Sequence, residues 1–85
     1  MKIDLSNPEP VVDATDLARV FNLAPLQVKD FMRAGAITSR FETGVGPDAG
    51  THRLTFWHNK TQVRFTCDAD GNVLKTARIK GARQA

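Results

Sequence analysis

The sequence predicts an α+β fold in which two short helices pack on one face of a four-stranded antiparallel sheet. Two observations predict it. Within residues 13–35 apolar side chains recur every three or four positions, which is the spacing of amphipathic helices. After residue 36 apolar and polar side chains alternate, which is typical of half-buried strands. Because both patterns leave one apolar face uncovered, helices and sheet can bury these faces only against each other.

Length and composition indicate one ordinary globular domain. The 85 residues are 41% hydrophobic and 25% charged, without repeats or low-complexity segments. A chain of this size buries only about 60–65% of the surface that it exposes when unfolded. We expect a single domain of four parts: a loop with room for a short strand (1–12), a helical hairpin (13–35), the sheet (36–80) and a frayed tail (81–85).

The first part contains a short alternating run. Ile3 and Leu5 alternate with polar neighbours, which permits an additional strand before the proline-containing break at 7–10. Neither the apolar stretch of a signal peptide nor the roughly 20 apolar residues of a membrane span occurs in the sequence. We therefore expect a cytoplasmic protein without a membrane partner.

The helical hairpin has defined ends in the sequence. Asp13 is a good N-cap for the first helix, and Asn22 can end it in the left-handed conformation. Pro25 suits the first turn of the second helix, and Gly35 suits its end. The stripes expected to face the sheet are Leu17, Val20 and Phe21 in the first helix and Val28, Phe31 and Met32 in the second.

The stretch DLARVFNLAPLQVKDFMRAG, residues 16–35, resembles the helix-turn-helix of small excisionase-like DNA-binding modules. It departs from that pattern at Asn22, where a turn glycine is usual, and at Ala24, where a small polar cap is usual. The resemblance implies that a DNA major groove would meet Gln27, Lys29, Asp30 and Arg33. A hairpin that only covers the sheet is the alternative.

The alternating segments are 37–42, 53–57, 62–67 and 73–79. Residues 59–60 can form the middle turn, and residues 69–71 suit a type I turn followed by a left-handed glycine. A middle turn at this place puts Phe56 opposite Val63 on the helix side. All five phenylalanines of the chain are then expected to point inward.

Positive charge is concentrated in the sheet. The formal net charge is +3 and the pI is near 9.5. Residues 1–43 hold five basic and six acidic side chains, net −1, whereas residues 44–85 hold seven and three, net +4. Attraction for polyanions is therefore expected mainly from the second half of the chain.

The same register gathers basic side chains on the sheet face opposite the helices. There Trp57 is expected to be surrounded by Arg40, Arg53, Arg64 and Arg78. Arginines beside an aromatic ring suit single-stranded nucleic acid or an acidic protein, and a merely solvated face is the alternative. We expect a small nucleic-acid-binding or regulatory protein that uses this face, with Lys29 and Arg33 assisting. The competing hypothesis is a protein-interaction module or homodimer that uses Trp57 and the open sheet edges.

Two further motifs could suggest a phosphate-binding loop and a catalytic or metal site, but their context favours neither. The glycine-rich segment 43–52 precedes a strand and not a helix, so it predicts a flexible loop and not a phosphate site. His52 and Cys67 should lie opposite each other on the inward side, but His58 is too far along the strand to complete a metal site. Cys67 is the only cysteine, which excludes a disulfide within one chain. We expect no enzymatic activity, cofactor or metal.

The run RAGAITSRFETGVGPDAGTHRLTFWH and the later VRFTCDADGNVL resemble a family of small bacterial proteins known only as a domain of unknown function. The likeness spans nearly the whole chain. It implies a shared single-domain architecture and supplies no activity, cofactor or functional residue.

Overall fold

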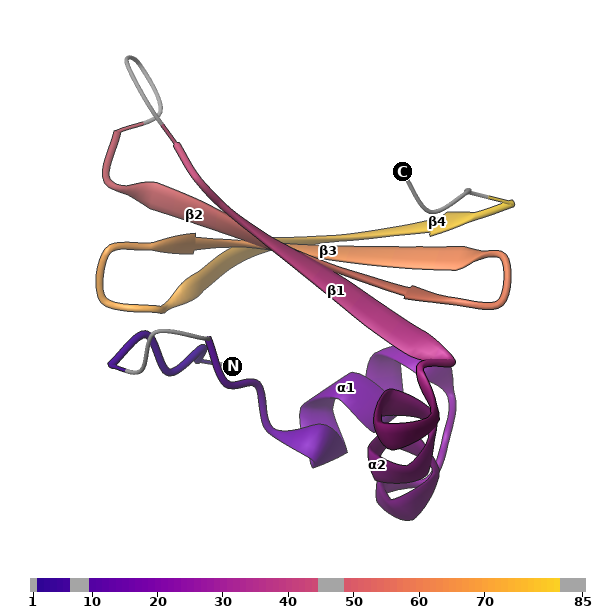
Figure 1. Ribbon diagram of the computed structural model, residues 1–85. Coiled ribbons are helices and arrows are strands. Elements are labelled where there is room, and N and C mark those ends of the chain that lie inside the picture. The colour runs from indigo at the N-terminus through magenta and orange to yellow at the C-terminus, as the bar shows by residue number, and fades with distance from the viewer. Residues whose placement is uncertain (1, 7–9, 45–48, 82–85) are drawn as a thin grey trace.

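The computed structural model describes residues 2–6, 10–44 and 49–81 (Figure 1). Its elements, in chain order, are α1 (Ala14–Phe21), α2 (Pro25–Ala34), β1 (Ile37–Thr43), β2 (Thr51–His58), β3 (Thr61–Asp68) and β4 (Val73–Lys80). The strands form one antiparallel sheet in the order β1-β2-β3-β4, and both helices lie on the same face of it (Figure 1). The predicted α+β fold is therefore confirmed. In the part described, neither helix has the length and hydrophobicity needed to cross a membrane.

The helix ends follow the sequence prediction. The Asp13 carboxylate accepts a hydrogen bond from the backbone N–H of Thr15 at 2.8 Å, and Asn22 closes α1 with a φ of 58°. Ala24 offers no capping oxygen to α2. The Gln27 side chain instead accepts a hydrogen bond from the Ala24 N–H at 2.8 Å, which is half of a capping box.

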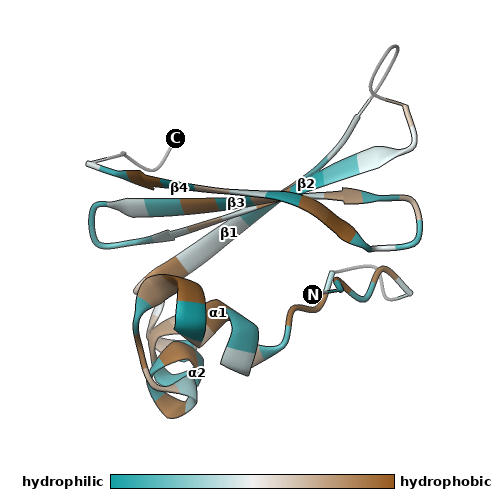
Figure 2. Cartoon of the chain, turned by 180° about the vertical axis from the view of Figure 1, so that it is seen from behind, coloured by the Kyte–Doolittle hydropathy of each residue, from teal (hydrophilic) through white to brown (hydrophobic). Residues whose placement is uncertain are grey.

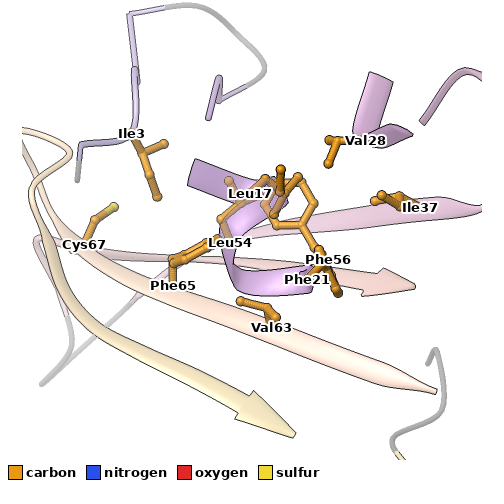
Figure 3. Packing of buried hydrophobic residues seen from close by; sticks show 11 residues of the cluster. Ile3, Leu17, Phe21, Val28, Ile37, Leu54, Phe56, Val63, Phe65 and Cys67 are labelled. Carbon is orange, nitrogen blue, oxygen red and sulfur yellow. The ribbon is translucent and has the colours of Figure 1, made fainter. Parts of the chain in front are cut away.

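The core lies between the helices and the sheet (Figure 3). Phe56 pairs with Val63 and Leu54 pairs with Phe65, as the middle turn predicts. The rings of Phe56 and Phe65 meet edge to face with centroids 6.1 Å apart. The buried hydrophobic residues are Ile3, Leu17, Ala18, Phe21, Val28, Ile37, Leu54, Phe56, Val63, Phe65 and Cys67.

Two residues expected to face the core are only partly covered. Phe41 points to the helix side, as predicted, but it is 37% exposed and Met32 of α2 is 45% exposed, so the inward-facing residues are not all buried. The reason is that the helices are shorter than the strands and cannot cover the whole face of the sheet. Helices of eight and ten residues are about 12 and 15 Å long, whereas strands of eight residues span about 26 Å. Phe41 does face the helix side, where it stacks on His52 with centroids 5.4 Å apart.

The N-terminal segment lies against the β3–β4 turn, and its described residues, 2–6 and 10–12, form no continuous strand. Two isolated bridges, Lys2 with Asn72 and Asp4 with Val11, replace the additional strand that the alternation permits. Ile3 is fully buried, and its N–H donates a hydrogen bond to the carbonyl oxygen of Gly71 at 2.7 Å. A short segment can thus contribute to the core without pairing along its length.

The turns that join β2 to β3 and β3 to β4 form where the sequence predicts them, and each contains a left-handed residue, which was predicted for Gly71. Asn59 has a φ of 54° and Gly71 a φ of 88°. Three regions singled out in the sequence extend beyond what the structure describes: the centre of the glycine-rich loop (45–48), the break (7–9) and the tail (82–85).

A β-bulge lies between Thr66 and Cys67, where the pairing with β4 shifts by one residue. Cys67 pairs with Val73, but Thr66 pairs with Lys75, so one residue of β4 has no partner across the ladder. Because side chains alternate between faces, this shift exchanges the faces of the rest of β4.

Candidate functional site

The sheet face that points away from the helices, here called the outer face, contains three rows of paired residues that span all four strands, and a shorter row of Thr51 and Asp68. The three rows are Thr38, Trp57, Gln62 and Ile79; Arg40, Thr55, Arg64 and Ala77; and Glu42, Arg53, Thr66 and Lys75. Figure 2 shows the alternation of hydrophilic and hydrophobic residues along the strands that separates this face from the core. No described helix or strand covers it (Figures 1 and 2).

Each of the four strands contributes one basic side chain to the outer face. They are Arg40 of β1, Arg53 of β2, Arg64 of β3 and Lys75 of β4, and the one acidic side chain in the three rows is Glu42. Arg40, Arg53 and Lys75 are exposed, and Arg64 is half-buried. Among the residues described, none of these four forms an ion pair within 4.0 Å, so their charge remains available to a ligand.

The centre of the outer face holds polar atoms that are buried without a hydrogen-bond partner in the described structure. Thr55 is 1% exposed although it lies on this face, and its hydroxyl oxygen has no partner. The same holds for the Thr38 hydroxyl, the Trp57 indole nitrogen and the Arg64 Nε. Thr38 is paired with Trp57, and Thr55 with Arg64.

These four atoms share a chemical character. Each belongs to a group that can donate a hydrogen bond. A buried polar group without a partner is rare and costs about 1–3 kcal/mol. We call Thr38, Thr55, Trp57 and Arg64 the donor cluster.

The expectation that Arg78 also flanks Trp57 is wrong. Arg78 pairs with Val63, a core residue, and so belongs to the helix face of the sheet. The bulge between Thr66 and Cys67 is the cause. Without it, Arg78 would pair with Gln62 on the outer face. The same shift brings Lys75 to the outer face, a position that the alternation in 73–79 does not reveal.

The second helix does not join this surface. Lys29 and Arg33 belong to α2, which packs on the opposite face of the sheet (Figure 1). Arg33 lies 3.9 Å from the carboxylate of Asp30, and both side chains are exposed. Gln27, the other polar residue proposed for a DNA groove, uses its side-chain oxygen to cap the helix. The structure therefore separates Lys29 and Arg33 from the arginines they were expected to assist.

His52 and Cys67 face each other on the helix side, as predicted. Cys67 is fully buried, and burial raises the pKa of its thiol, with a further rise from the nearby Asp68 carboxylate. The His52 Nδ1 lies 3.3 Å from the Thr43 hydroxyl. A thiol held in the protonated form by its surroundings is a poor nucleophile. In the described ranges no three His, Cys, Asp or Glu side chains come together as metal ligands.

His58 has a role that sequence reasoning missed. Its ring stacks on Phe31 with centroids 4.8 Å apart and is T-shaped to the Phe21 ring with centroids 5.7 Å apart. Its Nδ1 lies 3.1 Å from the carbonyl oxygen of Ala36, at the end of the helical hairpin. His58 therefore fastens both helices to the end of β2. A histidine at the end of a strand gives no sequence signal for such a contact.

Comparison with known proteins gives a family and no activity. No curated protein matches the chain, and no solved structure matches it. The model of one family, described as a family of unknown function (DUF6522), matches residues 1–85. Since the match covers every residue from the N-terminal segment to the end of the sheet and beyond, the chain belongs to this family of unknown function.

Proposed function

We propose that this protein binds single-stranded nucleic acid on the outer face of its sheet. The observation that carries the proposal is that one basic side chain from each strand lies on the same face as a half-buried tryptophan and the donor cluster. Phosphate oxygens carry negative charge and accept hydrogen bonds, so they suit the basic side chains of this face.

The shape of the surface favours single strands over a duplex. A sheet face is broad and flat, whereas the major groove of DNA admits a helix or a two-stranded ribbon. Trp57 can stack on a base only when that base is free of its duplex neighbours. The arginines would follow the backbone while the indole ring takes one base.

The proposal assigns binding to the sheet and not to the helix-turn-helix-like hairpin. On α2, Arg33 is next to an acidic side chain and Gln27 is used as a cap. Lys29 alone would bind duplex DNA weakly, because the affinity depends on the number of phosphates that basic side chains neutralise.

Fluorescence anisotropy with labelled single-stranded RNA, single-stranded DNA and duplex DNA tests the proposal. With four phosphates neutralised, the affinity for a single strand should fall about 50-fold between about 50 and 200 mM salt. Single strands should bind more tightly than the duplex. Unlabelled polyglutamate serves as a competitor, because an acidic protein surface would use the same charges without needing a free base.

Two charge-reversal variants distinguish binding at the outer face from attraction by the net charge of the whole protein. Arg53→Glu removes a basic side chain from the outer face, and Arg78→Glu makes the same change of charge on the opposite face. We expect Arg53→Glu to weaken binding strongly and to reduce the salt dependence, with a much smaller effect from Arg78→Glu. Trp57→Ala should cost about 5- to 150-fold in affinity through lost stacking. Equal effects of the two charge reversals, or polyglutamate competing as well as a single strand, would contradict the proposal.

A further inference from the structure

The free edge of β1 is a second open surface of the sheet. β1 pairs with β2 on one side and is the first strand of the sheet, so among residues 2–6, 10–44 and 49–81 no strand pairs with its other side. In Figure 1 β1 crosses in front of the other strands, and no described element lies over its middle. An open edge of this kind is a template for another strand.

Apolar side chains are exposed beside this edge. A groove of about 530 Å³ lies between the N-terminal segment, α2 and β1 on the helix side. Three of its apolar lining residues are exposed: Val11 at 51%, Met32 at 45% and Phe41 at 37%. Phe41 belongs to the edge strand itself, so whatever pairs with β1 would also cover the mouth of the groove.

We propose that a second copy of this chain pairs with β1 in antiparallel fashion, about a two-fold axis at Phe41. The charges of Arg40 and Glu42 determine where along β1 the axis lies. If it lay at Arg40 or at Glu42, that residue would stand opposite the same charge in the second copy. With the axis at Phe41, each Arg40 stands opposite Glu42 of the second copy.

Alternation of side chains supports the same register. Residues paired across antiparallel strands point to the same face, so an axis through a residue keeps the helices of both copies on one side. An axis at Ser39 would also do this, but it would leave Arg40 and Glu42 opposite uncharged residues. The axis at Phe41 additionally brings the two Phe41 rings together over the exposed ends of the grooves.

This pairing would join the two sheets and place both outer faces side by side. It depends on the edge of β1 and not on the donor cluster, so the inference goes beyond the proposed function. Its test contains no nucleic acid, and failure of one proposal therefore leaves the other standing.

Sedimentation velocity over a range of protein concentrations tests the dimer. We expect the wild type to sediment at twice the chain mass of 9.4 kDa. Arg40→Glu places two glutamates opposite each other at both contacts, and Glu42→Arg places two arginines there. Each variant alone should dimerise at least about tenfold more weakly. An equimolar mixture of the two should form a heterodimer, because every charge again meets its opposite.

Lys75→Glu is the matched control. Lys75 lies on the same face as Arg40 but on β4, the other edge of the sheet, and the change of charge is identical. Dimerisation of this variant should be unchanged, and circular dichroism should show that all variants remain folded. A monomeric wild type at the highest soluble concentration overturns the proposal. So does a mixture that stays monomeric, or a loss of dimer in Lys75→Glu as large as in Arg40→Glu.

Discussion

At the scale of single residues, Gly71 holds two parts of the chain together. Its φ of 88° is a conformation that residues with a side chain seldom adopt. The N-terminal segment also passes so close that a Cβ on Gly71 would collide with the carbonyl oxygen of Ile3. Gly50 has a similar φ of 89°, but open space surrounds it.

This pair of glycines gives a controlled prediction. Gly71→Ala should lower the free energy of unfolding by about 3 kcal/mol or more, because strain and collision add. Gly50→Ala should cost only about 1 kcal/mol, which is the strain alone. Urea denaturation measures both. Equal losses would mean that the approach of Ile3 contributes nothing.

The Asp68 carboxylate makes the stability of the fold depend on pH. Its carboxylate accepts hydrogen bonds from the side chain and backbone N–H of Asn72 at 3.1 and 2.9 Å and from the Asp70 N–H at 3.0 Å. These bonds favour the charged form, so the Asp68 pKa lies below its ordinary value of 3.8. The side chain therefore stabilises the fold fully above that value, and its contribution disappears as the pH falls through the lowered pKa.

Replacement of Asp68 by Asn tests this dependence. At neutral pH the variant should unfold at a lower urea concentration than the wild type, because the charged acceptor is gone. As the pH falls from about 4 through the lowered pKa, the wild type loses this contribution and the two unfolding curves should converge. A difference that is constant from pH 7 to pH 2 would contradict the assigned role of the charge.

At the scale of elements, the helical hairpin depends on its attachment to the sheet. Helices of eight and ten residues are too short to be stable in isolation. His58 contacts the rings of Phe21 and Phe31, one from each helix. His52 makes one similar contact, with Phe41, away from the helices.

The two histidines therefore differ in their predicted importance. His58→Ala should destabilise the fold by about 2 kcal/mol, since two ring contacts of about 0.5–1.5 kcal/mol each are lost. It should also speed amide hydrogen exchange in α1 and α2. His52→Ala should cost less than about 1 kcal/mol and leave exchange in the helices unchanged. Similar exchange in both variants would contradict the attachment role.

Local signals in the sequence predict most elements, and the failures have definite causes. Asp13, Asn22 and Gly35 mark helix ends by properties of their own side chains or backbone, and all three act as predicted. The register of β2 and β3 follows from one tight turn. The faces of β4 could not be predicted, because its sequence tolerates either orientation and the bulge at Thr66 and Cys67 decides between them.

At the scale of the whole molecule, helices cover only part of one side of the sheet. The principal extents of 35, 26 and 19 Å describe a flattened body, and its outer face is left open by every described element. Sequence reasoning found Arg40, Arg53, Trp57 and Arg64 of this face because β1, β2 and β3 alternate regularly. It could not find the donor cluster, because unpartnered buried atoms depend on side-chain packing between strands.

The bulge between Thr66 and Cys67 has a consequence for sequence change in this family. If the bulge were straightened with the length of the chain unchanged, β4 would realign along β3 while the turn and the other three strands stayed in place. Lys75 would then pair with Phe65 on the helix side, and Arg78 with Gln62 on the outer face. Relatives that keep or lose this irregularity would share one topology and present different charge patterns to their surroundings. Evolution could thus retune what the molecule attracts through the local geometry of one strand, with every basic residue kept at its place in the sequence.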